Sequence, residues 1–381
     1  MSSRLNPWPS DPLGVRITFM FSVRKVAVFL PNWVGDVVMA TPCLCALRAR
    51  FADARITYVG RPAALATLAG WKHADDVICD TSDSPWGAVN LLRLARRLRR
   101  ERADLAVLLP NSFRVALAAR LGAARRILGY DRDGRGWMLT DKIPPPRGPG
   151  GRCTPVSARD YYADLVALVG ADSRRGSMSL PVLPEDQAAA DAMLSEAGAD
   201  GRGPAVMLNP GASFGTSKMW DASRYAALAD LLIERRGARI ILNAAPSERH
   251  VAAWVAAAMR NPPAISFAER GNTLGLLKAL LKRCDLLVTN DTGARHLAAA
   301  LGIGVVTVFG STDPEWSRID YARERIVRVD VECSPCQEKL CAQPAGPAYH
   351  RCMESISPET VLSAAVELLD GGTRRKRGAR S

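Results

Sequence analysis

The stretch from Asp285 to Phe309, DLLVTNDTGARHLAAALGIGVVTVF, most constrains how this chain folds. An apolar run, a polar turn, an alanine-rich run that stops at Gly302 and a second apolar run follow one another. This pattern predicts a strand at 286–289, a turn at 290–293, a short helix and a strand at 305–309. Strands joined by a helix are parallel, and such sheets bind ligands at the carboxyl ends of their strands. We therefore expect a binding site at the turn.

The turn has the chemistry of a phosphate site with a carboxylate beside it. The first N–H groups of a helix lack partners and suit a phosphate. Asp291 repels an anion, so we expect it to shape the turn or to accept hydrogen bonds from a sugar or from backbone amides. His296 can point over the same pocket, although a lone helical histidine is more often structural. The Asp-Thr-Gly triplet also marks aspartic proteases, but it occurs once here and a helix pattern follows it. We interpret the turn as the holder of a nucleotide sugar's diphosphate.

Alternation of apolar strands with amphipathic helices occurs twice along the 381 residues. The pattern predicts an α/β protein with two Rossmann-like, doubly wound domains that face each other across a cleft. The proline-containing segment 179–185 separates the two series. The expected parts are a disordered extension at 1–22, an N-terminal acceptor-binding domain at 23–178, the linker at 179–185, a C-terminal nucleotide-sugar-binding domain at 186–357, a helix at 358–372 and a disordered basic tail at 373–381.

The net charge of +13 raises the question of whether the protein binds an anionic partner. In the segment 91–102 one helical face carries leucines and the others carry arginines, which is typical of a solvated surface helix. The alternative is attraction to an anionic lipid surface or to a phosphorylated acceptor. No recognition motif supports nucleic acid as a partner. No apolar run reaches the ~20 residues that span a bilayer, and residues 1–22 do not resemble a signal peptide.

The absence of two nucleotide-binding motifs disfavours several enzyme classes, and one aspartate is a candidate general base. Neither GxGxxG nor a Walker A motif occurs, which disfavours dinucleotide oxidoreductases, P-loop enzymes and sugar-nucleotide epimerases. Asp36 follows the predicted first strand, where an α/β enzyme can place a general base. Gly35 beside it allows a close approach of ligand and backbone. The alternative is that Asp36 caps the helix that follows.

The cysteines form a second candidate site. Nine cysteines without an export signal indicate reduced thiols or metal ligands. Cys333, Cys336, Cys341 and Cys352, with His350 nearby, have the spacing of a structural zinc or iron–sulfur site. The alternative is that reduced thiols pack an irregular loop.

Five motifs together carry a resemblance to a known family. In chain order they are NWVGD (32–36), LPNSF (109–113), GYDRDGRG (129–136), NPGASFGTSKMW (209–220) and NDTGARHLAAALG (290–302). Over roughly residues 24–370 the chain resembles the bacterial lipopolysaccharide heptosyltransferases of glycosyltransferase family 9, and within them the heptosyltransferase II group. The resemblance implies a GT-B fold, inversion and no catalytic metal or required cofactor. It implies transfer of L-glycero-D-manno-heptose from ADP-heptose to the lipopolysaccharide inner core of a Gram-negative bacterium, in the cytoplasm and in peripheral contact with the inner membrane.

The resemblance also assigns roles by position. Asp36 becomes the base that deprotonates the acceptor, and Lys218 meets the donor phosphates. Asp291 is expected at the heptose hydroxyls and Glu248 at the ribose. The expected donor-binding residues are Gly35, Gly211, Ser213, Lys218, Glu248, Asp291, Thr292, Gly293 and His296, and the expected acceptor-binding residues are Asn32, Trp33, Asn111, Ser112 and Arg114. Two alternatives stay open: a family 9 transferase for another nucleotide sugar, and a non-catalytic nucleotide-binding protein.

Overall fold

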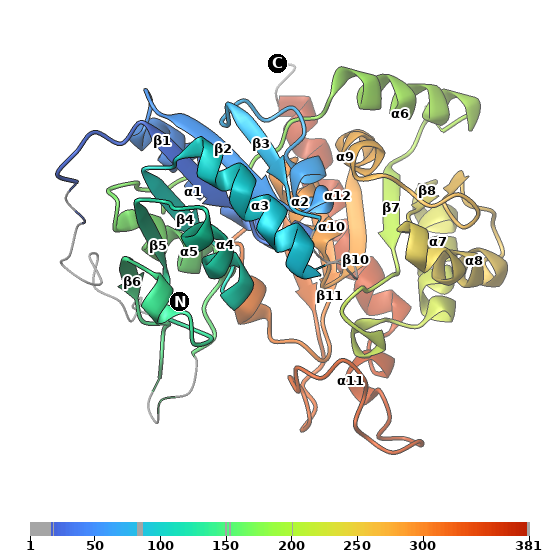
Figure 1. The fold of residues 1–381 in the computed structure, drawn as a ribbon. Helices are drawn as coiled ribbons and strands as arrows, with labels where there is room; N and C mark the ends of the chain where they lie inside the picture. Colours follow the sequence, from blue (N-terminus) through green and yellow to red (C-terminus); the bar gives the residue numbers. More distant parts are fainter. Residues whose placement is uncertain are drawn as a thin grey trace. The chain divides into compact units, whose positions relative to one another are not determined.

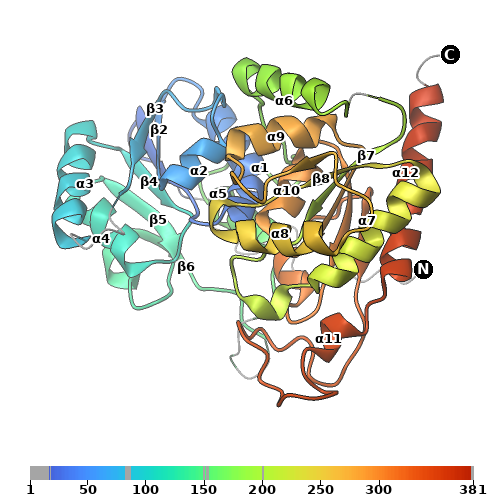
Figure 2. The ribbon, with the colours of Figure 1, turned by 90° about the vertical axis from the view of Figure 1, so that its right-hand side faces the viewer.

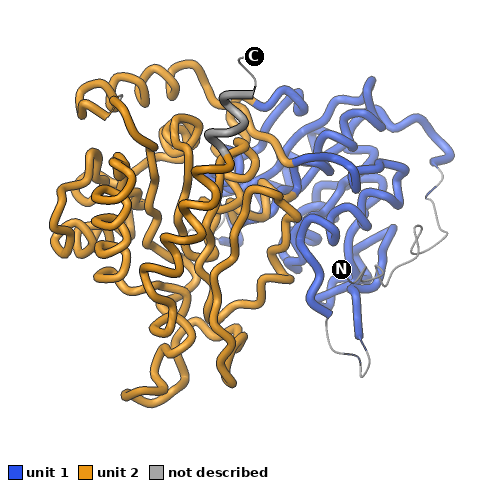
Figure 3. Tube along the Cα trace, turned by 180° about the vertical axis from the view of Figure 1, so that it is seen from behind, with its two compact units in different colours: residues 1–32, 40–65, 71–177 blue, residues 33–39, 66–70, 178–381 orange. Residues whose placement is uncertain are grey.

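The computed structural model describes residues 17, 19–81, 87–148, 151, 154–199 and 201–378. The chain divides into two compact units (Figure 3). Unit 1 comprises residues 1–32, 40–65 and 71–177, and unit 2 comprises 33–39, 66–70 and 178–381. The last change of unit along the chain lies between residues 177 and 178, and residues 33–39, which the sequence placed in the N-terminal domain, cluster with unit 2. The reason is packing, because Val38 is fully buried in a core cluster of unit 2.

Unit 1 is built on a parallel sheet with the order β3-β2-β1-β4-β5-β6 (Figure 1). Its strands are β1 (Lys25–Phe29), β2 (Arg55–Gly60), β3 (Asp76–Cys79), β4 (Leu105–Leu108), β5 (Arg126–Tyr130) and β6 (Asp141–Ile143). Its helices are α1 (Val34–Arg50), whose first turns cluster with unit 2, α2 (Pro62–Thr67), α3 (Gly87–Glu101), α4 (Phe113–Leu121) and α5 (Ala158–Ala167). The predicted basic helix is α3, which buries Leu94, Ala95 and Leu98.

Unit 2 repeats the same plan, with the order β12-β11-β10-β7-β8-β9. Its strands are β7 (Ala205–Asn209), β8 (Arg239–Leu242), β9 (Ile265–Ser266), β10 (Leu286–Asn290), β11 (Gly304–Val308) and β12 (Glu324–Val327). Its helices are α6 (Pro184–Glu196), α7 (Ala222–Arg236), α8 (Arg249–Ala258), α9 (Leu274–Arg283), α10 (Gly293–Ala300), α11 (Arg351–Glu354) and α12 (Pro358–Gly378). In both sheets the first and fourth strands of the unit are neighbours, so strand order reverses there, where doubly wound proteins bind ligands.

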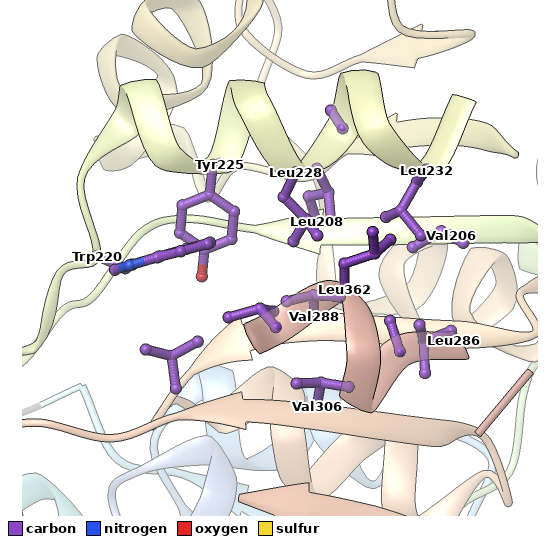
Figure 4. Close-up of a cluster of buried hydrophobic side chains, with 14 of the residues drawn as sticks. Val206, Leu208, Trp220, Tyr225, Leu228, Leu232, Leu286, Val288, Val306 and Leu362 are labelled. Atoms are coloured by element: carbon purple, nitrogen blue, oxygen red, sulfur yellow. The ribbon is translucent and has the colours of Figure 1, made fainter. Parts of the chain in front are cut away.

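Side-chain alternation along the strands builds a core on each face of the second sheet. Val206, Leu208 and Val288 face one cluster, to which α7 contributes Tyr225 and Leu228 (Figure 4). Helix α12 joins the same cluster, and Figure 2 shows α7 beside α8. Met207 and Leu287 point to the opposite cluster, together with residues of α9 and α10. Burial of both faces explains why these strands read as continuous apolar runs.

The ends of the chain differ from expectation. Phe19 and Phe21, in the part expected to be disordered, pack against each other, and Phe19 also contacts Phe51. Guanidinium groups of Arg125 and Arg126 lie over these two rings, so that aromatic burial and cation–π contacts order them. Residues 1–16 and 18 lie outside the described part.

The last helix is longer than predicted, and several small elements were not predicted. Helix α12 continues to Gly378, past the expected end at 372, and residues 379–381 are outside the described part. Sequence reasoning missed α2, α8, α11 and the short strands β6, β9 and β12. No helix in the described ranges has the length and apolar character needed to cross a bilayer.

Candidate active site

A cavity of about 460 Å³ lies at the switch point of the second sheet. Every residue that lines it belongs to unit 2, including the segment Trp33–Met39. The predicted site residues among them are Trp33, Gly35, Asp36, Ser213, Lys218, Glu248, Asp291, Thr292, Gly293 and His296. The expected cleft between the two domains stays a prediction, whereas this pocket is formed within one of them.

Lys218 and Asp291 form an ion pair in the pocket. The Lys218 ammonium lies 2.7 Å from Asp291 Oδ2, and both side chains are nearly buried. Thr312 donates a hydrogen bond to the same carboxylate oxygen, and Ser317 donates to the other. Burial raises the pKa of Asp291, but Lys218 and Arg295 outweigh it and hold that pKa below its usual value. Asp291 therefore stays ionised and accepts hydrogen bonds from Lys218, Thr312 and Ser317, while its expected contact with the heptose hydroxyls stays a prediction.

Asp36 is an acid whose proton affinity is tuned toward neutral pH. It lies in the first turn of α1. Burial, with help from the Asp291 carboxylate, raises the pKa of Asp36 to about 6, and Lys218 opposes the shift. A carboxyl group with this pKa is largely ionised at neutral pH and can still accept a proton.

His296 and Gly35 fix the distance between α1 and α10. His296 is buried, and burial together with Arg295 lowers the pKa of its imidazole to about 3. The ring is therefore neutral, and within the described chain its Nδ1 has no hydrogen-bond partner. A Cβ on Gly35 would lie 2.7 Å from His296 Cδ2, so that only glycine fits this contact.

Glu248, Ser213 and Gly211 form one edge of the pocket. Ser213 Oγ donates to Glu248 Oε1 at 3.2 Å. Burial raises the pKa of Glu248, and the hydrogen bond from Ser213 opposes this. Gly211 does not line the pocket, but a Cβ there would lie 2.2 Å from Glu248 Oε2, so the glycine makes room for the carboxylate.

A row of asparagine amides along the pocket was not predicted. Asn272 donates to Asn243, Asn243 donates to Asn209, and Asn209 donates to Thr289 and to Thr292. The bonds among the three asparagines and Thr289 join buried side chains, the bond to Thr292 is partly buried, and Asn209, Asn243 and Asn272 all line the cavity. Their positions could have predicted these residues, because Asn209 ends a strand and Asn243 follows one, and parallel sheets bind ligands at the carboxyl ends of their strands.

Most of the expected acceptor residues lie in unit 1 and already have protein partners. Asn111 accepts hydrogen bonds from Arg135 and from Tyr161. Arg135 is fully buried and also donates to Pro110 O, which joins the LPNSF and GYDRDGRG motifs. Arg114 pairs with Asp80 at 2.9 Å. Of the expected acceptor set, only Trp33 lines the cavity; Asn32, Asn111, Ser112 and Arg114 do not.

The four C-terminal cysteines lie in one neighbourhood. Cys341 Sγ accepts a hydrogen bond from the His350 N–H, two residues before Cys352. Burial and the thiols of Cys333, Cys336 and Cys341 raise the pKa of Cys352 to about 11. Among the described residues, no three His, Cys, Asp or Glu side chains are in position to hold a metal ion, so the metal site stays a prediction.

Comparisons with known proteins identify the family of this chain. The sequence profile of glycosyltransferase family 9 (heptosyltransferase) matches residues 91–345, about two thirds of the chain. The chain is 26% identical to lipopolysaccharide heptosyltransferase 2 of Salmonella typhimurium, over 91% of this chain and 98% of that protein.

Two solved structures share the fold. A family 9 glycosyltransferase from Veillonella parvula has a TM-score of 0.76 at 21% identity, covering 92% of this chain and 98% of its own. ADP-heptose lipopolysaccharide heptosyltransferase II of E. coli has a TM-score of 0.69 at 24% identity, covering 91% and 98%. They confirm the predicted fold class, GT-B with two Rossmann-like parts.

The contact between Gly35 and His296 generates a stability prediction. Helix propensity alone would make Gly35→Ala stabilising by about 1 kcal/mol. The clash with the buried imidazole instead makes it destabilising by about 1–3 kcal/mol. Gly371→Ala is the matched control, because Gly371 also lies in a helix and a Cβ there meets nothing. Urea unfolding of both variants measures the difference, and equal stabilities would contradict the tight contact.

Proposed function

This chain belongs to glycosyltransferase family 9, the heptosyltransferases, and we propose that it transfers heptose from ADP-heptose to the lipopolysaccharide inner core. The supporting names are those of its relatives, which are lipopolysaccharide and lipooligosaccharide heptosyltransferases. The observation that carries the proposal is the pairing, in one pocket, of a carboxyl group poised to take a proton with an ammonium group placed for a phosphate.

We propose a single displacement. The acceptor hydroxyl oxygen bonds to the anomeric carbon while the bond from that carbon to the phosphate oxygen breaks. Asp36 takes the hydroxyl proton, and the electron pair of the broken bond leaves with ADP. Attack from the face opposite the leaving group inverts the anomeric centre. Lys218 and the first N–H groups of α10 supply positive charge to the departing diphosphate, so that the step needs no catalytic metal.

The lining suggests how the donor is placed. Part of the lining is apolar, with Ala244, Pro246, Leu274 and Leu277, and suits a nucleobase. Glu248 also lines the pocket and can accept hydrogen bonds from hydroxyl groups of the ribose. Trp33 and Trp316 are exposed aromatic side chains of the same lining, and they offer flat apolar surfaces to the sugars.

We place the reaction in the cytoplasm, at the inner face of the inner membrane, where a lipid-linked acceptor would be reached. Helix α3 exposes Arg93, Arg96, Arg97, Arg99 and Arg100, a cationic surface that suits anionic lipid or acceptor phosphates. Asn111, Ser112 and Arg114 are proposed as acceptor contacts by their place after β4. No nucleic acid partner is proposed.

The base role of Asp36 gives a kinetic prediction. Asp36→Asn should lower kcat by about 10²–10⁴, the range for loss of a general base, while leaving ADP affinity nearly intact. In the parent enzyme, kcat/KM should rise with pH and level off above about 6, since Asp36 acts when it is ionised. Asp53→Asn, an exposed carboxylate just after α1, is the control. Comparable turnover in Asp36→Asn would remove Asp36 from the role of base.

An assay with several nucleotide-sugar donors distinguishes the proposed function from its two alternatives. With a truncated core lipid as acceptor, we expect transfer from ADP-heptose and little from UDP- or GDP-sugars. Efficient transfer from one of the latter would indicate a family 9 enzyme for another sugar. Binding of ADP without any transfer would favour the non-catalytic protein.

The four-cysteine site has its own test. We propose that Cys333, Cys336, Cys341 and Cys352 hold a structural zinc or iron–sulfur group, supported by their spacing in the sequence; among the described residues no three of them are placed as metal ligands. Metal analysis of an anaerobic preparation should find stoichiometric zinc or iron, which a Cys333→Ser variant loses and a Cys79→Ser variant keeps. A parent protein without stoichiometric metal would leave the thiols as packing groups of the loop.

A further inference from the structure

Between β12 and α11, residues Cys333–His350 contain neither helix nor strand, and we call this segment the strap. The strap packs on the loop that carries Lys218, residues 213–219, which we call the lysine loop. The only regular structure of the lysine loop is a single 3-10 turn over Thr216–Lys218. A turn this short does not hold its own position, so the position of Lys218 depends on what packs against the loop.

Three hydrogen bonds at Ser217, the residue before Lys218, and a close backbone approach at Gly215 join the strap to the lysine loop. The Ser217 N–H donates to Lys339 O at 3.2 Å, and Ser217 Oγ donates to Glu338 O. His350 Nε2 donates to Ser217 O at 3.0 Å. A Cβ on Gly215 would lie 2.2 Å from Lys339 O, so backbone meets backbone there without room for a side chain. Ser217 is 1% exposed, so its polar groups depend on these partners.

The strap is in turn anchored to the sheet at the pocket. Ser334 Oγ donates to Gly310 O, and the Gln337 N–H donates to Ser311 O at 2.8 Å. Both acceptors follow directly after β11, beside Thr312, which binds Asp291. Gln337 lines the pocket, in a left-handed conformation with φ of 62°. The strap therefore links the strand that supports Asp291 to the loop that supplies Lys218.

We propose that the strap positions Lys218, mainly through the contact between His350 of the strap and Ser217 of the lysine loop. This rests on the proposed function, in which Lys218 serves the donor diphosphate. A lysine side chain loses much conformational freedom when it is fixed, and a backbone held in advance reduces that cost at the transition state. The strap touches Lys218 through its backbone neighbours and leaves the ammonium group to Asp291 and the donor.

A double-mutant cycle tests this link. His350→Ala should lower kcat/KM for ADP-heptose about tenfold, the size expected for one lost hydrogen bond to a positioned group, and leave the acceptor KM unchanged. In a Lys218→Ala background the same change should cost nothing further, because both act on one function. His350→Gln keeps an N–H donor and should recover part of the loss. His73→Ala, a histidine of unit 1 outside the pocket, is the matched control.

The outcomes distinguish the role of Lys218 from the role of the strap. If Lys218→Ala leaves donor kinetics unchanged, the proposed role of Lys218 falls. If Lys218→Ala is impaired but His350→Ala costs the same in both backgrounds, the strap does not act through Lys218 and the inference is overturned. Should His350→Ala fail to fold, Ser217→Ala replaces it in the same cycle with the same expected non-additivity.

Discussion

The ion pair between Lys218 and Asp291 is the interaction on which the pocket depends. Two nearly buried charges lose hydration, and a buried pair persists only when further hydrogen bonds satisfy it. Thr312 and Ser317 provide these bonds to the carboxylate. The lysine lies in the loop after β7 and the aspartate directly follows β10. Because β7 and β10 are neighbours, the pair joins the two loops at the switch point of the sheet. In the proposed function, an incoming diphosphate would meet an ammonium group that this ion pair already holds in place.

The same pair sets the protonation of its neighbours. The Asp291 carboxylate adds to burial in raising the pKa of Asp36, while Lys218 limits the shift, and the result near 6 suits a base. His296 is kept neutral by burial and by Arg295, so it adds no charge that would compete with Lys218. In the proposed function, Lys218 is the cation for the leaving group and Asp36 is the carboxylate that accepts the proton. This division of roles follows from burial and distance rather than from residue type alone.

The sequence was sufficient for the parts of the site that follow from local pattern. The apolar run, turn and helix around Asp291 predicted β10 and α10, because strand and helix periods are local properties. The positions of the motifs predicted that Asp36 and Lys218 belong to one site, and both line the pocket. Long-range packing could not be predicted from the sequence. The burial of Val38, which places the Asp36 segment in unit 2, depends on such packing, and the amide row and the strap join residues far apart in the chain. The expectation that Asp291 meets the heptose hydroxyls stays a prediction, and its ion pair with Lys218 was not foreseen from the sequence.

A crystal structure of this protein with ADP bound tests the role of Lys218 most directly. We expect the diphosphate at the first turn of α10, with the Lys218 ammonium within hydrogen-bond distance of a phosphate oxygen and Asp36 on the open side of the pocket. A diphosphate bound elsewhere, or a Lys218 ammonium that makes no contact with it, would contradict this role.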